Sequence, residues 1–245
     1  MITRIPHKLA ILAFFLIGSI SVQAQDQDWP SYGGDNGSRK YSPLDQINAD
    51  NVDQLEAAWT WTSVDNATVA QNIADENFRA MPAGFKATPI VVDGVMYIPT
   101  SYGRIAAIDA ATGEEKWVFD TTAWETGRPP NLGYNSRGVG YWEKGNKKRV
   151  FFATNDAVLW SIDVTTGQPD ADFGEGGRVD LTQGLGREID RRQYGVVSPP
   201  LVTNDIVVVN SIINDGPTTK EMPPGHVRGF NPDTGAVEWM FHTIP

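Results

Sequence analysis

The sequence predicts an all-β fold: a propeller built from four-stranded antiparallel sheets, called blades below. Three observations support this prediction. A turn motif occurs three times, each copy lies between short runs of apolar residues, and glycine and polar turn residues separate those runs. The intervals between the copies are of the order of the ~40–50 residues that a four-stranded propeller blade takes.

The repeated motif is a small residue, an apolar residue, Asp or Asn, two spacers, Thr-Gly and then an aromatic residue. An Asp or Asn side chain can hydrogen-bond its own backbone and open a turn, and the glycine can adopt positive φ. The aromatic residue, such as Trp117 or Trp239, is expected to pack on a neighbouring sheet. Three unrelated Thr-Gly hairpins are the alternative, but they would not explain the matching flanks. The copies are residues 107–117, 161–173 and 229–239.

The first blade is expected at roughly residues 85–120. Residues 88–100 form a hairpin around Asp93-Gly94, which is the strongest short-range hairpin signal. Residues 104–108 supply the third strand and lead into the first turn motif, and residues 116–119 supply the fourth.

Two further blades are expected at roughly 137–175 and 196–243. Their strands are predicted at 139–142, 149–153 and 158–162, and at 201–203, 206–210, 227–230 and 238–242. Residues 174–194 are polar and rich in glycine, so we expect a loop between these blades. Residues 214–225 are expected to be an insertion in the third blade. Before the blades, we expect a helical turn in 48–56, a strand at 55–61 and a long loop at 63–84.

The amino terminus has the pattern of an export signal. Arg4 and Lys8 precede an apolar run at 9–22, and Val22-Gln23-Ala24 offers small residues for cleavage. The run is shorter than the ~20 residues that span a membrane. We therefore predict a signal peptide at residues 1–24 and a mature chain, residues 25–245, that works in the periplasm. An uncleaved inner-membrane anchor is the alternative.

Composition excludes several classes of function. The net charge is −10 and no basic stripe is present, so nucleic acid is not expected as a partner. The chain has no cysteine. Disulfides, thiolate metal sites, a covalently attached c-type haem and a lipid-modified cysteine are therefore excluded together.

With its turn motif and intervening stretches, the chain resembles the quinoprotein dehydrogenases, which use pyrroloquinoline quinone (PQQ) and a divalent metal. The motif resembles their tryptophan-docking repeat, and the resemblance is greatest to the membrane-type glucose dehydrogenase branch. It implies an eight-bladed propeller, of which this chain would supply about three blades. The stretches that carry it lie at 29–35, 87–90, 137–142, 198–200 and 227–230.

The resemblance also implies roles for individual residues. Arg137 matches an arginine that binds a carboxylate of the quinone, as a guanidinium fork can do. Ser198 matches positions that hydrogen-bond the quinone, and Lys86 stands where many members carry Glu near it. Asp215, with Asn214 beside it, matches a ligand of the metal, Ca²⁺ or Mg²⁺, which prefers oxygen. Each assignment has an alternative. Arg137 could be a surface arginine paired with an acid such as Glu143, and Ser198 could be a serine that simply precedes two prolines. Residues 214–217 could form a polar turn.

The function implied is oxidation of a glucose-like aldose or an alcohol by hydride transfer to the quinone, with a quinone or cytochrome as electron acceptor. The catalytic base of the family belongs to later blades, so no catalytic residue is expected in this chain, and alone it is expected to be inactive. The cysteine pair of the alcohol-oxidising branch is replaced by Asn131-Leu132. A non-enzymatic propeller acting as an envelope assembly scaffold, and a carbohydrate-binding module, are the alternatives.

Overall fold

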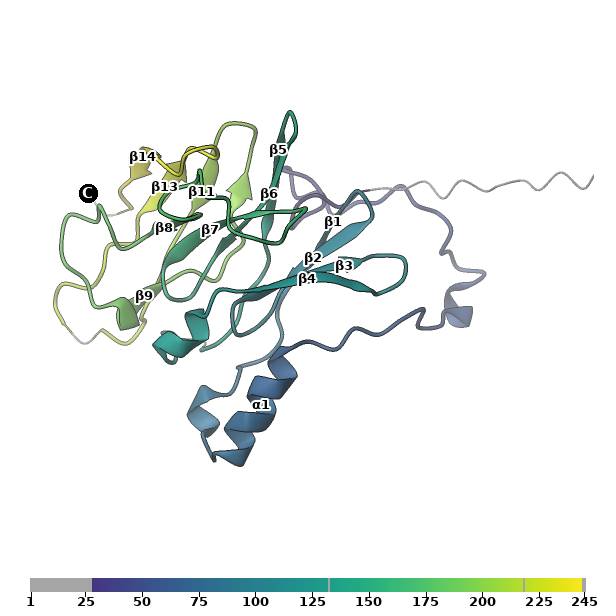
Figure 1. The fold of residues 1–245 in the computed structure, drawn as a ribbon, viewed down its shortest axis with the longest axis horizontal. Coiled ribbons are helices and arrows are strands. Elements are labelled where there is room, and N and C mark those ends of the chain that lie inside the picture. Colours follow the sequence, from purple (N-terminus) through teal and green to yellow (C-terminus); the bar gives the residue numbers. More distant parts are fainter. Residues whose placement is uncertain (1–27, 132, 218, 244–245) are drawn as a thin grey trace, which may run out of the picture.

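A computed structural model of the chain describes residues 28–131, 133–217 and 219–243. These residues form three four-stranded antiparallel sheets, which lie next to one another along the chain (Figure 1). The all-β propeller architecture predicted from the sequence is therefore confirmed. The predicted signal peptide, residues 1–24, lies outside the described residues. Among the helices that the structure describes, none has the length and apolar character that crossing a membrane requires.

The first blade has the predicted order, with each strand paired to the next along the chain. Its hairpin turns at Asp93 and Gly94, whose φ angles are 50° and 71°. Val92 pairs directly with Val95 across this turn, so the predicted two-residue hairpin is confirmed. The strands are β1 (Ile90–Val92), β2 (Val95–Pro99), β3 (Arg104–Asp109) and β4 (Glu115–Asp120).

The second blade extends further along the chain than predicted. Residues 174–194 were expected to form a loop, but they contain a strand, a 3₁₀ helix and the beginning of a short ladder. Leu159 pairs with Val179, which packs on the core between the second and third blades. The elements are β5 (Gly140–Lys144), β6 (Lys147–Ala153), β7 (Val158–Asp163), β8 (Arg178–Asp180), η4 (Arg191–Gln193) and β9 (Tyr194–Gly195).

The third blade ends its second strand earlier than predicted. The second strand was predicted at 206–210, but the chain leaves the sheet after Val209, and the next strand, β12, pairs with β9 instead. The strand that ends at Val209 is β11. It is the second strand of its sheet, and β10 lies beside it at the edge. The strands are β10 (Leu201–Val202), β11 (Val207–Val209), β12 (Ile212–Ile213), β13 (Val227–Phe230) and β14 (Val237–Phe241).

The three turn motifs close as predicted. In the first copy, the Asp109 carboxylate accepts hydrogen bonds from the backbone N–H of Ala111 and Thr112, both at 3.1 Å. Asp163 and Asn231 do the same in the other copies. The glycines of all three copies have positive φ. They are Gly113 (76°), Gly167 (67°) and Gly235 (74°).

Residues before the first blade correct two predictions. The expected loop at 63–84 contains the helix α1 (Asp65–Ala74), which projects from the lower side of Figure 1, and η2 (Phe78–Ala80). Asp65 anchors the helix: it is buried and accepts hydrogen bonds from Thr100, the backbone of Tyr102 and Arg104. Residues 55–61 are not in a strand, because no described strand pairs with them. The expected helical turn is η1 (Val52–Gln54), and η3 (Ala123–Thr126) follows the first blade.

The core lies between the blades, and β6 shows why. Its side chains alternate, so Val150 and Phe152 join the cluster shared with the first blade, while Phe151 and Ala153 join the cluster shared with the third. All four are buried. The second blade is therefore buried on both faces, as expected for sheets packed radially.

Candidate functional site

The segments that lead into the three first strands meet at one end of the sheets, which we call the rim. The backbone N–H of Thr88 donates to the carbonyl of Arg137 at 2.9 Å, and the N–H of Arg137 donates to the carbonyl of Val197 at 3.0 Å. Lys86 lies two residues before Thr88, and Ser198 directly follows Val197. The three candidate cofactor-binding residues, which are far apart in the sequence, thus lie on adjacent segments.

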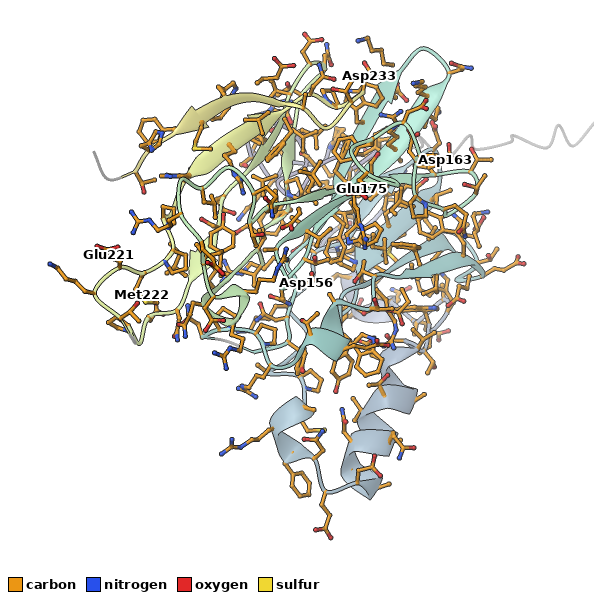
Figure 2. All side chains as sticks on the ribbon, turned by 60° about the vertical axis from the view of Figure 1, so that its left-hand side comes forward. Asp156, Asp163, Glu175, Glu221, Met222 and Asp233 are labelled. Atoms are coloured by element: carbon orange, nitrogen blue, oxygen red, sulfur yellow. The ribbon has the colours of Figure 1, made fainter. Side chains whose placement is uncertain are left out.

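The rim lies at the opposite end of the strands from the Thr-Gly turns. In Figure 2, Asp163 and Asp233 mark the turn end, and Asp156, which follows β6 at the other end, lies well away from them. Gly138 allows the rim segments to approach closely. A Cβ at Gly138 would lie 3.2 Å from the Cβ of Pro199 and 3.4 Å from the carbonyl oxygen of Thr88.

Arg137 has a guanidinium that is available to a ligand. The side chain is exposed, and no ion pair involves it among the described residues. Glu143, the acid that could have paired with it, is engaged elsewhere. It accepts a hydrogen bond from the Tyr141 hydroxyl at 3.1 Å and lies 3.7 Å from the Lys148 ammonium. Burial, together with this carboxylate, raises the pKa of Tyr141.

Buried polar atoms without partners occur on the two residues directly before Arg137 and on Asn155, and sequence reasoning missed them. Within the described residues, Asn135 Oδ1, Ser136 Oγ and Asn155 Oδ1 have no hydrogen-bond partner. Asn135 is fully buried and the other two are nearly so. The Asn155 amide donates to the Asn135 carbonyl at 3.0 Å, which joins the two segments. The sequence signal was the Asn-Ser pair directly before Arg137, in a stretch with no strand period.

Ser198 and Lys86 are less constrained than Arg137. Ser198 is half-buried, and its hydroxyl oxygen lies 3.5 Å from the amide nitrogen of Asn210, at the limit of a hydrogen bond. Lys86 is exposed. Both side chains can therefore reorient toward a ligand without breaking a buried contact.

The two candidate metal ligands lie in the insertion of the third blade. The Asn214 side chain is already used: its nitrogen donates to Gln193 at 2.7 Å, and its oxygen accepts from Gly216 N–H at 3.1 Å. The backbone of Asp215 donates to Asn131 Oδ1 at 2.7 Å, and its carboxylate is exposed. Within the described residues, no three His, Cys, Asp or Glu side chains gather in a metal-binding group.

A cavity of about 590 Å³ lies beside the lead-in segments of the second and third blades. Its walls come from the first strands of the second and third blades, the Val92–Asp93 turn and residues 28–38. Its volume falls in the ~300–1,000 Å³ range of ligand sites. It extends from the hairpin end of β1 to Val139 and Pro199 of the lead-in segments, but none of the five candidate residues lines it. The predicted cofactor-binding residues Lys86, Arg137 and Ser198 lie on the rim segments and not in the cavity lining, so the rim remains the candidate site.

Comparison with known proteins identifies relatives along nearly the whole chain. The family model described as glucose/ethanol/alcohol dehydrogenase, beta-propeller domain, of the PQQ type, matches residues 29–245. Quinoprotein glucose dehydrogenase A of Acinetobacter calcoaceticus is 33% identical over 236 residues. Quinoprotein glucose dehydrogenase of Escherichia coli (strain K12) is 31% identical over 236 residues.

These alignments cover 89% and 88% of this chain but only 28% and 27% of the relatives. The crystal structure of quinohemoprotein alcohol dehydrogenase from Comamonas testosteroni superposes with a TM-score of 0.66 and 26% identity. It covers 91% of this chain, which in turn covers 28% of that structure. The chain spans less than a third of the length of these relatives. It belongs to the PQQ-dependent glucose, ethanol and alcohol dehydrogenase β-propeller family.

Proposed function

We propose that this chain is the amino-terminal part of a PQQ- and metal-dependent dehydrogenase that oxidises a sugar, such as a glucose-like aldose, or an alcohol. The observation that carries the proposal is the rim, where Lys86, Arg137 and Ser198 lie on adjacent lead-in segments. The relatives named above act, by their names, on glucose and on alcohol, so the proposal includes both substrates.

The residues of the rim fit a flat polar cofactor that carries carboxylates. Arg137 offers a planar fork that matches a carboxylate and keeps its charge at any relevant pH. The unpartnered Ser136 hydroxyl could donate a hydrogen bond to a carboxylate, whereas the unpartnered amide oxygens of Asn135 and Asn155 only accept and would need a donor group on the ligand. Ser198 and Lys86 would add a hydroxyl and an ammonium. When bound, PQQ supplies the hydride acceptor of the reaction.

The metal site is incomplete in this chain. Asp215 offers one carboxylate, and the Asn214 amide oxygen, which accepts from the Gly216 N–H, has a second lone pair to offer. Ca²⁺ takes ~6–8 oxygen ligands. The described residues therefore do not fit a metal site by themselves, and we derive no step of the reaction through a metal. Asp215 is proposed as one ligand of a set completed elsewhere.

The role of this chain in the proposed reaction is to bind and orient the cofactor. The base is proposed to lie outside the chain, as the family resemblance implies. The amino-terminal pattern supports export to the periplasm, either with a cleaved signal peptide or with an inner-membrane anchor. A quinone or a cytochrome is proposed as the electron acceptor.

Titration of PQQ into the chain, followed by absorbance, tests the cofactor site. We expect Arg137→Ala to weaken binding by about tenfold or more, since a hydrogen-bonded charge contributes ~1.5–3 kcal/mol. The PQQ affinity of Arg137→Lys should lie between those of the parent and Arg137→Ala, because lysine keeps the charge but loses the planar fork. Arg192→Ala is the matched control, as this exposed arginine pairs with Asp190. Equal affinity of the Arg137→Ala variant and the parent would contradict the proposal.

A dye-reduction assay tests the proposal that the catalytic base lies outside this chain. With PQQ, Ca²⁺ and glucose or ethanol, the chain alone is expected to give no turnover above a protein-free blank. Turnover that needs the chain would show that the base lies within it.

A further inference from the structure

Two histidines face each other at the rim end of the third blade. β13 and β14, at the upper left of Figure 1, are antiparallel, and Val227 pairs with Phe241. The next pair in this register is His226 and His242. Side chains directly opposite each other on antiparallel strands project to the same face, with Cβ atoms ~4.5–5.5 Å apart. The register therefore places both imidazoles on one side of the sheet.

The two rings are in contact. Their centroids lie 4.3 Å apart, with an angle of 66° between the ring planes. His226 is 7% exposed, whereas His242 is exposed. Within the described residues, His226 Nδ1 is buried and has no hydrogen-bond partner. A buried ring nitrogen without a partner is uncommon in a folded protein, and nothing described competes with a ligand for it.

The groups around His226 are the neighbouring imidazole, two arginines and neutral polar side chains. Burial lowers the pKa of His226, and the neighbouring His242, Arg228 and Arg187 lower it further. Arg228 is buried and donates to backbone carbonyls of residues 181 and 183, so it is held in place. The other contacts are neutral: Ser211 donates to the His226 carbonyl, and Thr243 donates to that of Gly225. Deprotonated imidazole is the ligand that transition metals require.

We propose that His226 and His242 form a two-imidazole site for a borderline transition-metal cation, with Cu²⁺ bound most tightly and Ni²⁺ and Zn²⁺ less so. Imidazole suits these ions, and their affinities follow the order Zn²⁺ < Cu²⁺ and Ni²⁺ < Cu²⁺. His242 is exposed, so its ring can rotate to direct a nitrogen toward the ion. Water would complete the coordination. The cationic Arg228 and Arg187 nearby limit the affinity.

This site differs in chemistry from the one implied at Asp215. Hard cations such as Ca²⁺ and Mg²⁺ take oxygen ligands, and imidazole does not suit them. Ca²⁺ should therefore not compete for the histidine pair, which lets the two sites be measured separately. The proposal does not depend on cofactor binding or on turnover.

Isothermal titration calorimetry with CuCl₂ tests the proposal on the chain of 245 residues. We expect one Cu²⁺ per chain, with an affinity that an excess of CaCl₂ does not change. His242→Gln should weaken binding by about tenfold or more, because even supporting residues of metal sites contribute ~10–100-fold. This variant alters an exposed side chain, so the fold should be retained, as circular dichroism would confirm. His226→Gln should weaken binding to a similar degree.

The chain supplies its own matched control. It contains three histidines, and the third is His7. His7→Gln should leave Cu²⁺ binding unchanged. The proposal would be overturned if His242→Gln bound Cu²⁺ as the parent does, if the loss followed His7 instead, or if the parent bound no Cu²⁺ at neutral pH.

Discussion

The two junctions between blades use the same kind of acceptor but different donors. At the first junction, the indole N–H of Trp117 donates to the carbonyl of Val164, directly after Asp163 of the second turn motif, at 2.9 Å. At the second, the corresponding carbonyl belongs to Pro232, and the buried guanidinium of Arg149 donates to it at 2.6 Å. The turn motif thus presents a carbonyl, and the donor depends on the neighbouring blade.

The surroundings of the two donors differ as well. The Trp117 ring lies against Gly167, where a Cβ would be 2.6 Å from the indole. Arg149 is 1% exposed, forms an ion pair with Asp170 and lies over the Trp142 ring, with 5.2 Å from Cζ to the centroid. Phe173, the aromatic residue of the second motif, is buried in the core instead. At the second junction, the buried and charged Arg149 guanidinium therefore takes the place that the Trp117 indole has at the first.

A third indole shows that the Trp117 arrangement is the regular one. Trp59 lies before the first blade, and its indole N–H donates to the carbonyl of Ala110 at 3.2 Å. Its ring lies against Gly113, at 2.6 Å from the position of a Cβ. The turn motifs of the first and second blades thus each receive an indole in a similar geometry. Trp239 carries the same motif position in the third blade and is 38% exposed, on a strand whose other outward side chains, Val237 and Phe241, are also exposed.

The largest effect should come from removing the buried charge at the second junction. Arg149→Met would leave the Asp170 carboxylate and the Pro232 carbonyl without their partner. Breaking a buried pair in this way costs about 3–5 kcal/mol. Urea denaturation followed by circular dichroism measures the loss, with Arg192→Ala as the control for an exposed pair. A loss under about 1 kcal/mol would mean that the guanidinium is dispensable, and the contrast between the junctions would fail.

A smaller effect is expected at the first junction when a methyl group is added where the Trp117 ring packs. Gly167→Ala places a methyl group against the Trp117 ring at positive φ, whereas Gly145→Ala has positive φ with nothing within 4 Å. The control should cost about 1–2 kcal/mol for the backbone alone. Gly167→Ala should cost about 1–3 kcal/mol more, because overlap in a packed site is added. Equal losses of unfolding free energy in Gly167→Ala and Gly145→Ala would show that the indole can move away from the added methyl group at no cost.

The smallest effect tests the indole hydrogen bond itself. Trp117→Phe keeps an aromatic ring but removes the donor to the Val164 carbonyl, and should cost about 1 kcal/mol, typical of one hydrogen bond. Trp59→Phe should cost a similar amount if the two docks are equivalent. The same denaturation measurement applies. A loss at one site and none at the other would show that the two docks differ despite their similar geometry.

Local patterns carried most of the correct predictions. The hairpin at Asp93-Gly94 and the three Thr-Gly turns depend on residues within five positions of one another, so the sequence alone specifies them. Two predictions failed where the neighbours are distant. α1 is anchored through Asp65 to residues 35 or more positions away, and the strand predicted at 55–61 has no described partner. Propensity cannot anticipate such contacts.

The candidate site divides in the same way. Lys86, Arg137 and Ser198 were identified from sequence through a family resemblance, and their roles stay predictions. That they lie on adjacent segments, and that Asn135, Ser136 and Asn155 present unpartnered oxygens beside them, could not be inferred from any local pattern. The backbone bonds that join the segments link residues of three different blades.

The sequence by itself determined the repeated turn, its positive-φ glycine and the carbonyl that each turn presents, because these follow from hydrogen bonds between near neighbours. Only the tertiary structure decided which side chain reaches that carbonyl. The Arg149 donor is 83 residues from Pro232, and Trp117 is 47 residues from Val164. Contacts over such distances form only when the blades pack, so they depend on the shape and burial of both partners together.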